Sequence, residues 1–213
     1  MNVYFSAPLS LLFAITSAQS VTLTYNTTRP NLSPIATRPG TGTSINYYDD
    51  GDFRTAPIRG NSLQFSSGLG IAGPDRGPLW PENGSAYIYL LIGDSYEVSS
   101  LSGRSFSAQQ IDLAEYSTVF DFARNITFEG VKEDGSIVQT VFRLDGLIGP
   151  SASGNDFQTF TFPDSFSGLQ TLRSDSNPFS LDNLVLEPVP IPEPSAPVML
   201  MSFLIALSCG RRR

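Results

Sequence analysis

The segment AYIYLLI, from Ala86 to Ile92, is the clearest β-strand signal in this chain. It is a short uncharged run of aromatic and aliphatic residues, and runs of this kind are typical of strands that are buried on both faces. Upstream of it, Val21, Leu23 and Tyr25 alternate with threonine, which is the pattern of a strand with one buried face. Both patterns predict β-structure.

Further strand-like runs follow, separated by clusters of Gly, Pro, Asp, Asn and Ser. They cover residues 44–48, 61–66, 119–128, 137–144, 157–162, 168–173 and 179–186. The sequence Glu133, Asp134, Gly135 divides two of these runs and predicts a hairpin between Phe128 and Phe142. The only helical feature we expect in the body is a turn at residues 108–114.

The composition agrees with an all-β protein. The chain has 18 Gly and 16 Pro in 213 residues, and only 15% of its residues are charged. Nine or ten strands without a convincing helix predict an antiparallel two-sheet sandwich, with a jelly roll as the favoured form. We expect one such domain over residues 19–186, which is long enough to enclose its own core.

The N-terminus reads as a secretory signal peptide over residues 1–18. An apolar run from Ala7 to Ile15 has the length of a signal core and is expected to be helical, and small residues follow it. We expect cleavage between Ala18 and Gln19. The alternative is a buried first strand, because the segment before the apolar run has no Lys or Arg.

The C-terminal segment, residues 187–213, has three parts in a fixed order. The tripeptide Pro192, Glu193, Pro194 comes first, an uncharged stretch over residues 195–210 follows, and Arg211, Arg212 and Arg213 end the chain. As a single hydrophobic helix the stretch would span roughly 24 Å, so it predicts a short membrane anchor whose arginines extend its reach. The arginines predict a cytoplasmic end and an exported body.

Charge and residue usage exclude several functions. The tail holds three arginines and two glutamates, which leaves 10 basic and 18 acidic side chains, a net charge of −8, in residues 19–186. An acidic domain disfavours nucleic acid as a partner. The chain has no histidine, which removes most nucleophilic triads and zinc sites, and its single cysteine, Cys209, excludes an intrachain disulfide.

The tail resembles the PEP-CTERM sorting segment of exported bacterial proteins, which is also known as the ice-binding protein C-terminal domain. The resemblance rests on the tripeptide, the apolar run and the terminal arginines, and covers residues 189–213. It implies that an exosortase, an integral membrane processing enzyme, cuts near Pro192 to Pro194. It also implies that the body is delivered to the cell surface or the exopolysaccharide matrix.

The body resembles galactose-binding-like jelly rolls. The segments that carry this resemblance are LAEYS at 113–117, FQTFTFP at 157–163 and FSLDNLVLE at 179–187. In such domains a structural calcium can join an early loop to the last strand, which would pair Asp50 and Asp52 with Asp182. The alternative for the acidic cluster at 49–52 is a solvated surface turn. No other cofactor is expected.

Aromatic side chains are the candidate ligand-binding residues, because sugar rings stack on exposed Trp or Tyr. Trp80 lies in the proline-flanked loop GPLWPENG, and Tyr47, Tyr48 and Tyr96 are further candidates. The alternative is that Trp80 folds inward and fills a gap in the core.

Three functions remain. The first is a non-catalytic surface or matrix protein that binds polysaccharide, and the second is a structural matrix protein with no specific ligand. The third is a carbohydrate-active enzyme, which would need two carboxylates facing each other across a groove, roughly 5 to 10 Å apart. We assign no catalytic residues and favour the first function.

Overall fold

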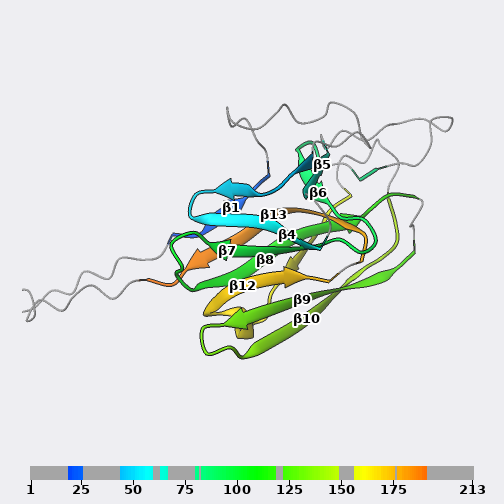
Figure 1. Cartoon of the computed structure of the whole chain (residues 1–213). Helices are drawn as coiled ribbons and strands as arrows, with labels where there is room; N and C mark the ends of the chain where they lie inside the picture. The colour runs from blue at the N-terminus through cyan, green and yellow to red at the C-terminus, as the bar shows by residue number, and fades with distance from the viewer. Residues whose placement is uncertain are drawn as a thin grey trace, which may run out of the picture. The chain divides into compact units, whose positions relative to one another are not determined.

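The computed structural model describes residues 19–25, 44–59, 63–66, 80–81, 83–118, 122–148, 156–175 and 177–190. In these ranges it contains thirteen strands, and every pair of neighbouring strands is antiparallel (Figure 1). The prediction of an all-β, antiparallel protein is therefore confirmed. The elements are β1 (Val21–Leu23), β2 (Ser44–Ile45), β3 (Tyr48–Asp50), β4 (Phe53–Arg59), β5 (Leu63–Ser66), β6 (Tyr87–Tyr89), β7 (Ser95–Ser100), β8 (Phe106–Glu115), β9 (Arg124–Lys132), β10 (Ile137–Leu144), β11 (Gln158–Thr161), the 3-10 helix η2 (Asp164–Phe166), β12 (Leu169–Ser174) and β13 (Phe179–Pro188).

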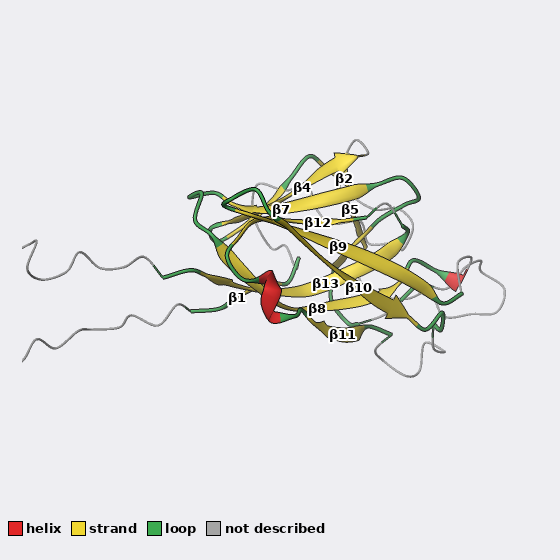
Figure 2. Cartoon of the chain, turned by 90° about the horizontal axis from the view of Figure 1, so that it is seen from below, coloured by secondary structure: helices red, strands yellow, loops and turns green. Residues whose placement is uncertain are grey.

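The strand pairings fall into two groups. In the first group the order is β2-β5-β6-β13-β8, with β1 also paired to β13 and β11 to β8. In the second group the order is β3-β4-β7-β12-β9-β10. A single pairing, Leu169 with Phe106, joins β12 to β8 and so connects the two groups. Figure 2 shows β1, β8, β11 and β13 towards one side of the molecule and β4, β7 and β12 towards the other, where β2 and β5 of the first group are also drawn.

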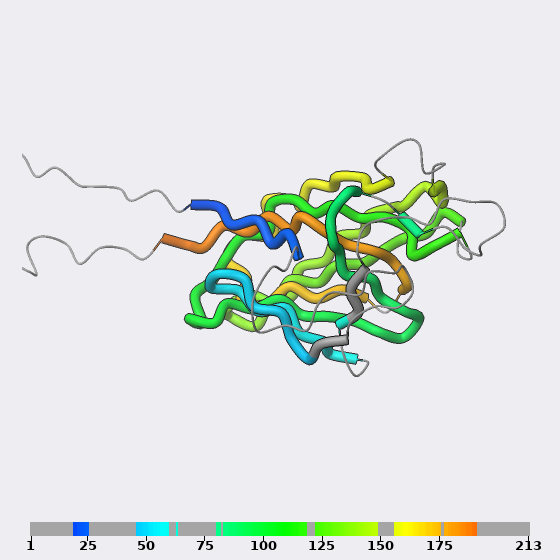
Figure 3. Tube along the Cα trace, turned by 90° about the horizontal axis from the view of Figure 1, so that it is seen from above, coloured from blue at the N-terminus to red at the C-terminus, as the bar shows by residue number. Residues whose placement is uncertain are grey.

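Strand β13 organises the first group. It pairs with β8 over nearly its whole length, from Phe179 opposite Glu115 to Pro188 opposite Phe106. Its other edge is shared by two short strands, β6 near its beginning and β1 near its end. Figure 3 shows β1 running beside β13, although the two strands lie at opposite ends of residues 19–189, which form one compact unit.

One hydrophobic cluster contains side chains from both groups of strands. Phe128 of β9 contacts Phe142 of β10, Phe162 and Phe179 of β13, with ring centroids 5.4 to 6.1 Å apart. These contacts place apolar side chains of distant segments in the same buried volume. Burial of such large rings is the main source of stability in a chain without disulfides.

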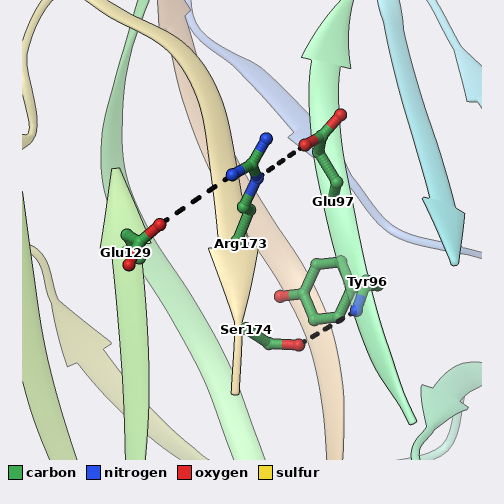
Figure 4. Close-up of polar contacts among 5 residues, drawn as sticks. All are labelled: Tyr96, Glu97, Glu129, Arg173 and Ser174. Carbon is green, nitrogen blue, oxygen red and sulfur yellow. Dashed lines mark hydrogen bonds and ion pairs between the residues drawn. The ribbon is translucent and has the colours of Figure 1, made fainter. Parts of the chain in front are cut away.

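The solvent-facing side of the second group carries a row of charges across three strands (Figure 4). Arg173 of β12 lies opposite Glu97 of β7 and Glu129 of β9. Its guanidinium nitrogens lie 2.7 and 3.9 Å from the two carboxylates. The three side chains are 29 to 41% exposed, so we expect a modest contribution to stability and a preference for this strand register.

The hairpin between Phe128 and Phe142 is confirmed. Strands β9 and β10 pair through eight successive positions, from Ile137 opposite Val131 to Leu144 opposite Arg124. Gly135 in the connection has a φ of 79°, which glycine adopts without the steric cost of a side chain. The backbone N–H of Lys132 closes the turn on the carbonyl of Ser136 at 2.9 Å.

Two predicted strands are shorter than expected. From Ala86 to Leu90 the side chains are buried, but only Tyr87–Tyr89 is a strand. Leu91 and Ile92 are 42% and 70% exposed, because the chain turns at Gly93, whose φ is 92°. The strand predicted at residues 119–128 corresponds to β9, which begins only at Arg124. Residues 119–121 lie outside the described part.

The helical turn expected at residues 108–114 is wrong, since these residues belong to strand β8. The positions of β8 that face the main core are Phe106, Ala108, Ile111 and Leu113. The buried side chains of Ala108 and Ile111 are three residues apart, which is also the spacing found on one face of a helix. Here the spacing comes from a β-bulge, because Val185 lies opposite Gln110 and the next residue, Leu186, lies opposite Ala108. β8 therefore has one more residue than β13 at this point, and the alternation of buried and exposed side chains along β8 shifts by one position.

Strands β4 and β7 were not predicted. Both are rich in polar residues, and each has buried side chains at alternate positions: Phe53 and Thr55 in β4, Tyr96 and Val98 in β7. The alternation was present in the sequence, but each run contains only two or three apolar side chains, too few to stand out.

Several expectations concern residues outside the described ranges. These are the signal helix at 1–18, the sorting motif Pro192, Glu193 and Pro194, the hydrophobic helix at 195–210 and the terminal arginines. Within the ranges that are described, no helix has the length and apolar character needed to cross a membrane.

The connection after β10 depends on a glycine and a buried acid. The backbone N–H of Gly146 donates to Oε1 of Glu115 at 2.6 Å, and burial raises the pKa of Glu115. Gly146 has a φ of 87°. A Cβ at this position would overlap the backbone of Phe122 and Ala123, which cannot move away as a flexible side chain could.

We expect Gly146→Ala to lower the free energy of unfolding by at least about 3 kcal/mol, through backbone overlap and the cost of positive φ. The matched control is Gly135→Ala, which has a similar φ of 79° but no atom within 4 Å of the added Cβ, and should cost only roughly 1 to 2 kcal/mol. Urea unfolding of both variants measures the difference. Equal losses would show that close packing at Gly146 is unimportant.

Candidate functional site

Polar and aromatic side chains gather on the outer face of the first group of strands. Leu181 of β13, Leu113 of β8 and Ile88 of β6 point into the main core. Because side chains alternate along a strand, their sequence neighbours lie on the opposite face. Tyr87, Tyr89, Ala114 and Phe157 form a second, smaller hydrophobic cluster there.

Two aspartates lie opposite each other on this face. Asp182 of β13 and Asp112 of β8 are direct partners in the antiparallel ladder, and we call them the aspartate pair. Immediately after Asp182 the ladder contains a bulge, in which Asn183 has a φ of 47°. Asparagine tolerates this left-handed conformation better than most residues. The bulge thereby places Asn183 beside both carboxylates.

Asn183 bridges the aspartate pair. Its backbone N–H donates to Oδ1 of Asp182 and its side-chain Nδ2 donates to Oδ2 of Asp112, both at 2.8 Å. On the other side of Asp112, the hydroxyl of Thr159 in β11 donates to Oδ1 at 2.6 Å. Each oxygen of Asp112 therefore accepts a hydrogen bond from a different strand.

The loop before β6 covers Asp182. Nδ2 of Asn83 and Oγ of Ser85 both donate to Oδ2 of Asp182, at 2.6 and 2.8 Å. Oδ1 of Asn83 in turn accepts from the backbone N–H of Ser85 at 2.9 Å, across Gly84. Asp182 thus holds this loop against the sheet and is itself fully buried.

Burial raises the pKa of Asp182 to about 6. The hydrogen bonds from Ser85, Asn183 and Asn83 favour the ionised form and limit the rise, and the nearby charge of Asp112 adds to it. No arginine or lysine contributes among these causes. The carboxylate is therefore stabilised by neutral donors alone, and the environment is electronegative.

An aromatic triad lies farther along the same face as the aspartate pair. Trp80 lies 4.7 Å from Tyr116 in an edge-on arrangement and 5.4 Å from Tyr89, and Tyr89 lies 5.6 Å from Tyr116, measured between ring centroids. Trp80 and Tyr116 are partly buried against the small hydrophobic cluster. Ser180, two residues before Asp182, lies opposite Tyr89 and connects the triad to the pair.

This arrangement combines two kinds of contact. The aspartate pair and the amides and hydroxyls around it offer acceptors and donors of fixed orientation, which suit hydroxyl-rich or amino-bearing ligands. The partly exposed rings of Trp80 and Tyr116 offer an apolar surface with a polarised π-face. Contacts of both kinds are used by proteins that bind sugars or organic cations.

The aromatic residues that the sequence suggested as ligand contacts have different surroundings in the structure. Trp80 is neither fully exposed nor inside the main core, because it packs partly buried against the small hydrophobic cluster, and ligand binding by Trp80 stays a prediction. Tyr47 is 48% exposed, but it lies elsewhere, with the guanidinium of Arg54 4.0 Å from its ring centroid. Tyr48 and Tyr96 are corrected: they are 2% and 0% exposed and belong to the main core, so neither can stack on a ligand.

The proposed calcium ligands have different surroundings. Asp52 accepts hydrogen bonds from Ser100 and Ser102 at a turn, whereas Asp182 is bonded to Asn83, Ser85 and Asn183. Asp50 lies in β3. Over the described ranges, no group of three or more His, Cys, Asp or Glu side chains is positioned to hold a metal ion. Calcium binding stays a prediction.

Sequence reasoning missed Asp112, Tyr89, Tyr116 and Asn183. Tyr89 was assigned to a buried strand, Asp112 lies inside the segment 108–114 that was expected to be a helical turn, and Tyr116 follows that segment. The available signal was the Asp-Asn step at 182–183 within FSLDNLVLE, because an asparagine tolerates the positive φ that a bulge can require.

A pocket lies between the start of β8 and η2. It has a volume of about 220 Å³ and is lined by Ser107, Ala108, Gln109, Phe162, Pro163, Asp164, Phe166 and Ser167. This volume is below the roughly 300 Å³ of typical small-molecule sites. It also lacks the combination of aromatic rings and paired carboxylates described above.

Comparison with known proteins identifies no family. No family profile matches the chain, and no curated protein matches it. Among solved structures it is similar to the enzymatically active domain of tailspike protein 4 of bacteriophage CBA120, with 8% identity and a TM-score of 0.30. The match covers 65% of this chain and 19% of the phage chain, and it is too distant to support an argument about fold or function.

The raised pKa of Asp182 predicts how stability depends on pH. Its value of about 6 lies above the ordinary value of 3.8, so the folded state binds the proton more tightly than the unfolded state. This stabilisation is complete below pH 3.8 and is lost as the pH rises through about 6. It amounts to roughly 3 kcal/mol. Glu115, whose pKa is also raised, acts in the same direction.

Urea unfolding between about pH 4 and pH 7 should therefore give a falling free energy of unfolding. In Asp182→Asn the decrease should be smaller, because asparagine does not titrate. In Asp164→Asn, which removes an exposed carboxylate on η2, it should be unchanged. An identical pH dependence of the free energy of unfolding in wild type and Asp182→Asn would contradict a raised pKa at Asp182.

Proposed function

We propose that this chain is an exported, non-catalytic protein of the cell surface or extracellular matrix, sorted through its C-terminal tail and binding polysaccharide through the outer face of β6, β13 and β8. The observation that carries the binding proposal is the aromatic triad on the same face as the aspartate pair. Proteins bind sugars through ring stacking combined with oriented polar groups, and this face supplies both.

We further propose that the fold is a two-sheet jelly-roll sandwich. Two features support this proposal. The strand pairings form two groups joined only at Leu169 and Phe106 within the described residues. The main hydrophobic cluster also takes side chains from both groups, as the core between two stacked sheets does.

The sorting part of the proposal is supported by the sequence of residues 187–213. The Pro-Glu-Pro tripeptide, the uncharged stretch and the terminal arginines favour insertion into a membrane with the body outside, followed by processing. The acidic body is compatible with an extracellular role and gives no support to binding of nucleic acid.

Binding is favoured over catalysis by the geometry of the aspartate pair. A glycosidase needs two carboxylates that approach the scissile bond from opposite sides. Here the two carboxylates lie side by side on neighbouring strands, and Asn183 bridges them. Asn83 and Ser85 cover Asp182. This arrangement presents a fixed polar surface rather than a groove between two acids.

A glycan array tests the binding proposal, with the purified full chain applied in the presence and absence of calcium. We expect saturable binding to one class of sugar, weakened about tenfold or more by Trp80→Ala, because stacking on the indole is lost. The control Tyr47→Ala removes an exposed aromatic ring outside the site and should leave binding unchanged.

Thermal unfolding of both variants shows whether the fold is retained, and Trp80→Phe, which keeps an aromatic ring, should retain part of the affinity. Absence of binding to every sugar under both conditions would contradict the proposal and favour a structural matrix protein without a specific ligand.

The sorting proposal is tested by replacing Pro192, Glu193 and Pro194 with alanine in a bacterium that contains an exosortase. We expect an unprocessed, larger species to accumulate in the membrane fraction on an immunoblot. Pro190→Ala, just before the motif, serves as the control and should be processed normally. Normal release of the triple variant would contradict a role for the tripeptide.

A further inference from the structure

The aspartate pair has no cationic partner among the described residues. The ion pairs there join Arg54 to Asp49 and Arg173 to Glu97 and Glu129, and none involves Asp112 or Asp182. Two facing carboxylates with only neutral donors leave an uncompensated negative charge, which is unfavourable when partly buried. A bound cation would relieve this cost.

A buried hydroxyl without a partner lies in the same site. Ser180 is fully buried, and its Oγ has no hydrogen-bond partner in the described part of the chain. It lies two residues before Asp182, so both side chains are on the same face of β13, and it is opposite Tyr89 of the aromatic triad. An unpaired hydroxyl therefore lies between the pair and the triad.

Asp112 is the accessible member of the pair. It is partly exposed, and its neighbour Thr159 is exposed, whereas Asp182 is covered. Each oxygen of Asp112 accepts one hydrogen bond, from Thr159 or from Asn183. An ionised carboxylate has about four acceptor positions, so Asp112 can accept further donors without losing these two.

We propose that the site selects oligosaccharides that carry free, protonated amino groups over N-acetylated and acidic ones, with the ammonium of one sugar at Asp112 and the ring of another sugar of the same chain against the triad. This inference rests on the proposed polysaccharide-binding function and specifies its substrate class. An ammonium forms charge-assisted hydrogen bonds with a carboxylate and is attracted to the faces of Trp and Tyr. A uronate would be repelled by the pair and by a body whose net charge is −8 over residues 19–186.

Isothermal titration calorimetry of the full chain tests the proposal with three matched oligosaccharides: a β-1,4-linked glucosamine pentamer, its N-acetylated form and a glucuronate oligomer. Near pH 6 we expect the amino form to bind about tenfold or more tightly than the N-acetylated form, and the glucuronate oligomer to bind most weakly. Asp112→Asn should reduce affinity for the amino form to that of the N-acetylated form. Asp164→Asn removes the same charge elsewhere and should preserve the preference.

Salt provides a test that needs no variant, in case Asp112→Asn does not fold. Raising the salt concentration from about 50 to about 500 mM should reduce the preference of the wild type for the amino form, because the charges are partly exposed. A preference that does not change with salt would overturn the proposal.

The outcomes separate this inference from the proposed function. Binding of all neutral sugars through Trp80, without preference for the amine, would overturn the inference and leave polysaccharide binding intact. Binding of none of the three oligomers, together with a negative glycan array, would overturn both.

Discussion

The pairing of β13 with β8 on one edge and with both β6 and β1 on the other is the constraint on which the first group of strands depends. These contacts connect segments up to about 165 positions apart, as in Val21 opposite Leu186. Because side chains alternate along a strand, the register of its pairing decides both which side chains face the core and which face outward. It directs Leu181 and Leu184 into the main core and leaves Ser180 and Asp182 on the outer face.

The bulge in β13 adapts this regular ladder to a polar function. Without an extra residue, Asn183 would follow the pleat and point away from Asp182. In its left-handed conformation it donates to both members of the aspartate pair. The cost of the positive φ and of burying a carboxylate is offset by hydrogen bonds from Asn83 and Ser85, which in turn hold the loop that follows Trp80. The polar and aromatic parts of the site are thus mechanically linked.

Sequence patterns were reliable where apolar residues were dense or a turn had distinctive chemistry. The hairpin of β9 and β10 followed from Glu133, Asp134 and Gly135 between two alternating runs. They failed where paired strands carry bulges, because an extra residue changes the period from two to three, as between Ala108 and Ile111. They also failed to distinguish buried from exposed tyrosines, since Tyr47 and Tyr48 are adjacent in sequence but lie on opposite sides of the chain.

The sequence by itself determined the all-β class, the acidic charge and the lack of histidine, because these depend on composition and on local order along the chain. The export and sorting segments stay predictions. The sequence also identified Trp80 and Asp182 as candidates. Only the tertiary structure decided that Asp112 lies opposite Asp182 and that Tyr89 and Tyr116 surround Trp80. Those contacts arise from strand pairing between distant segments, and a register that brings residues 112 and 182 together leaves no signal at either position alone.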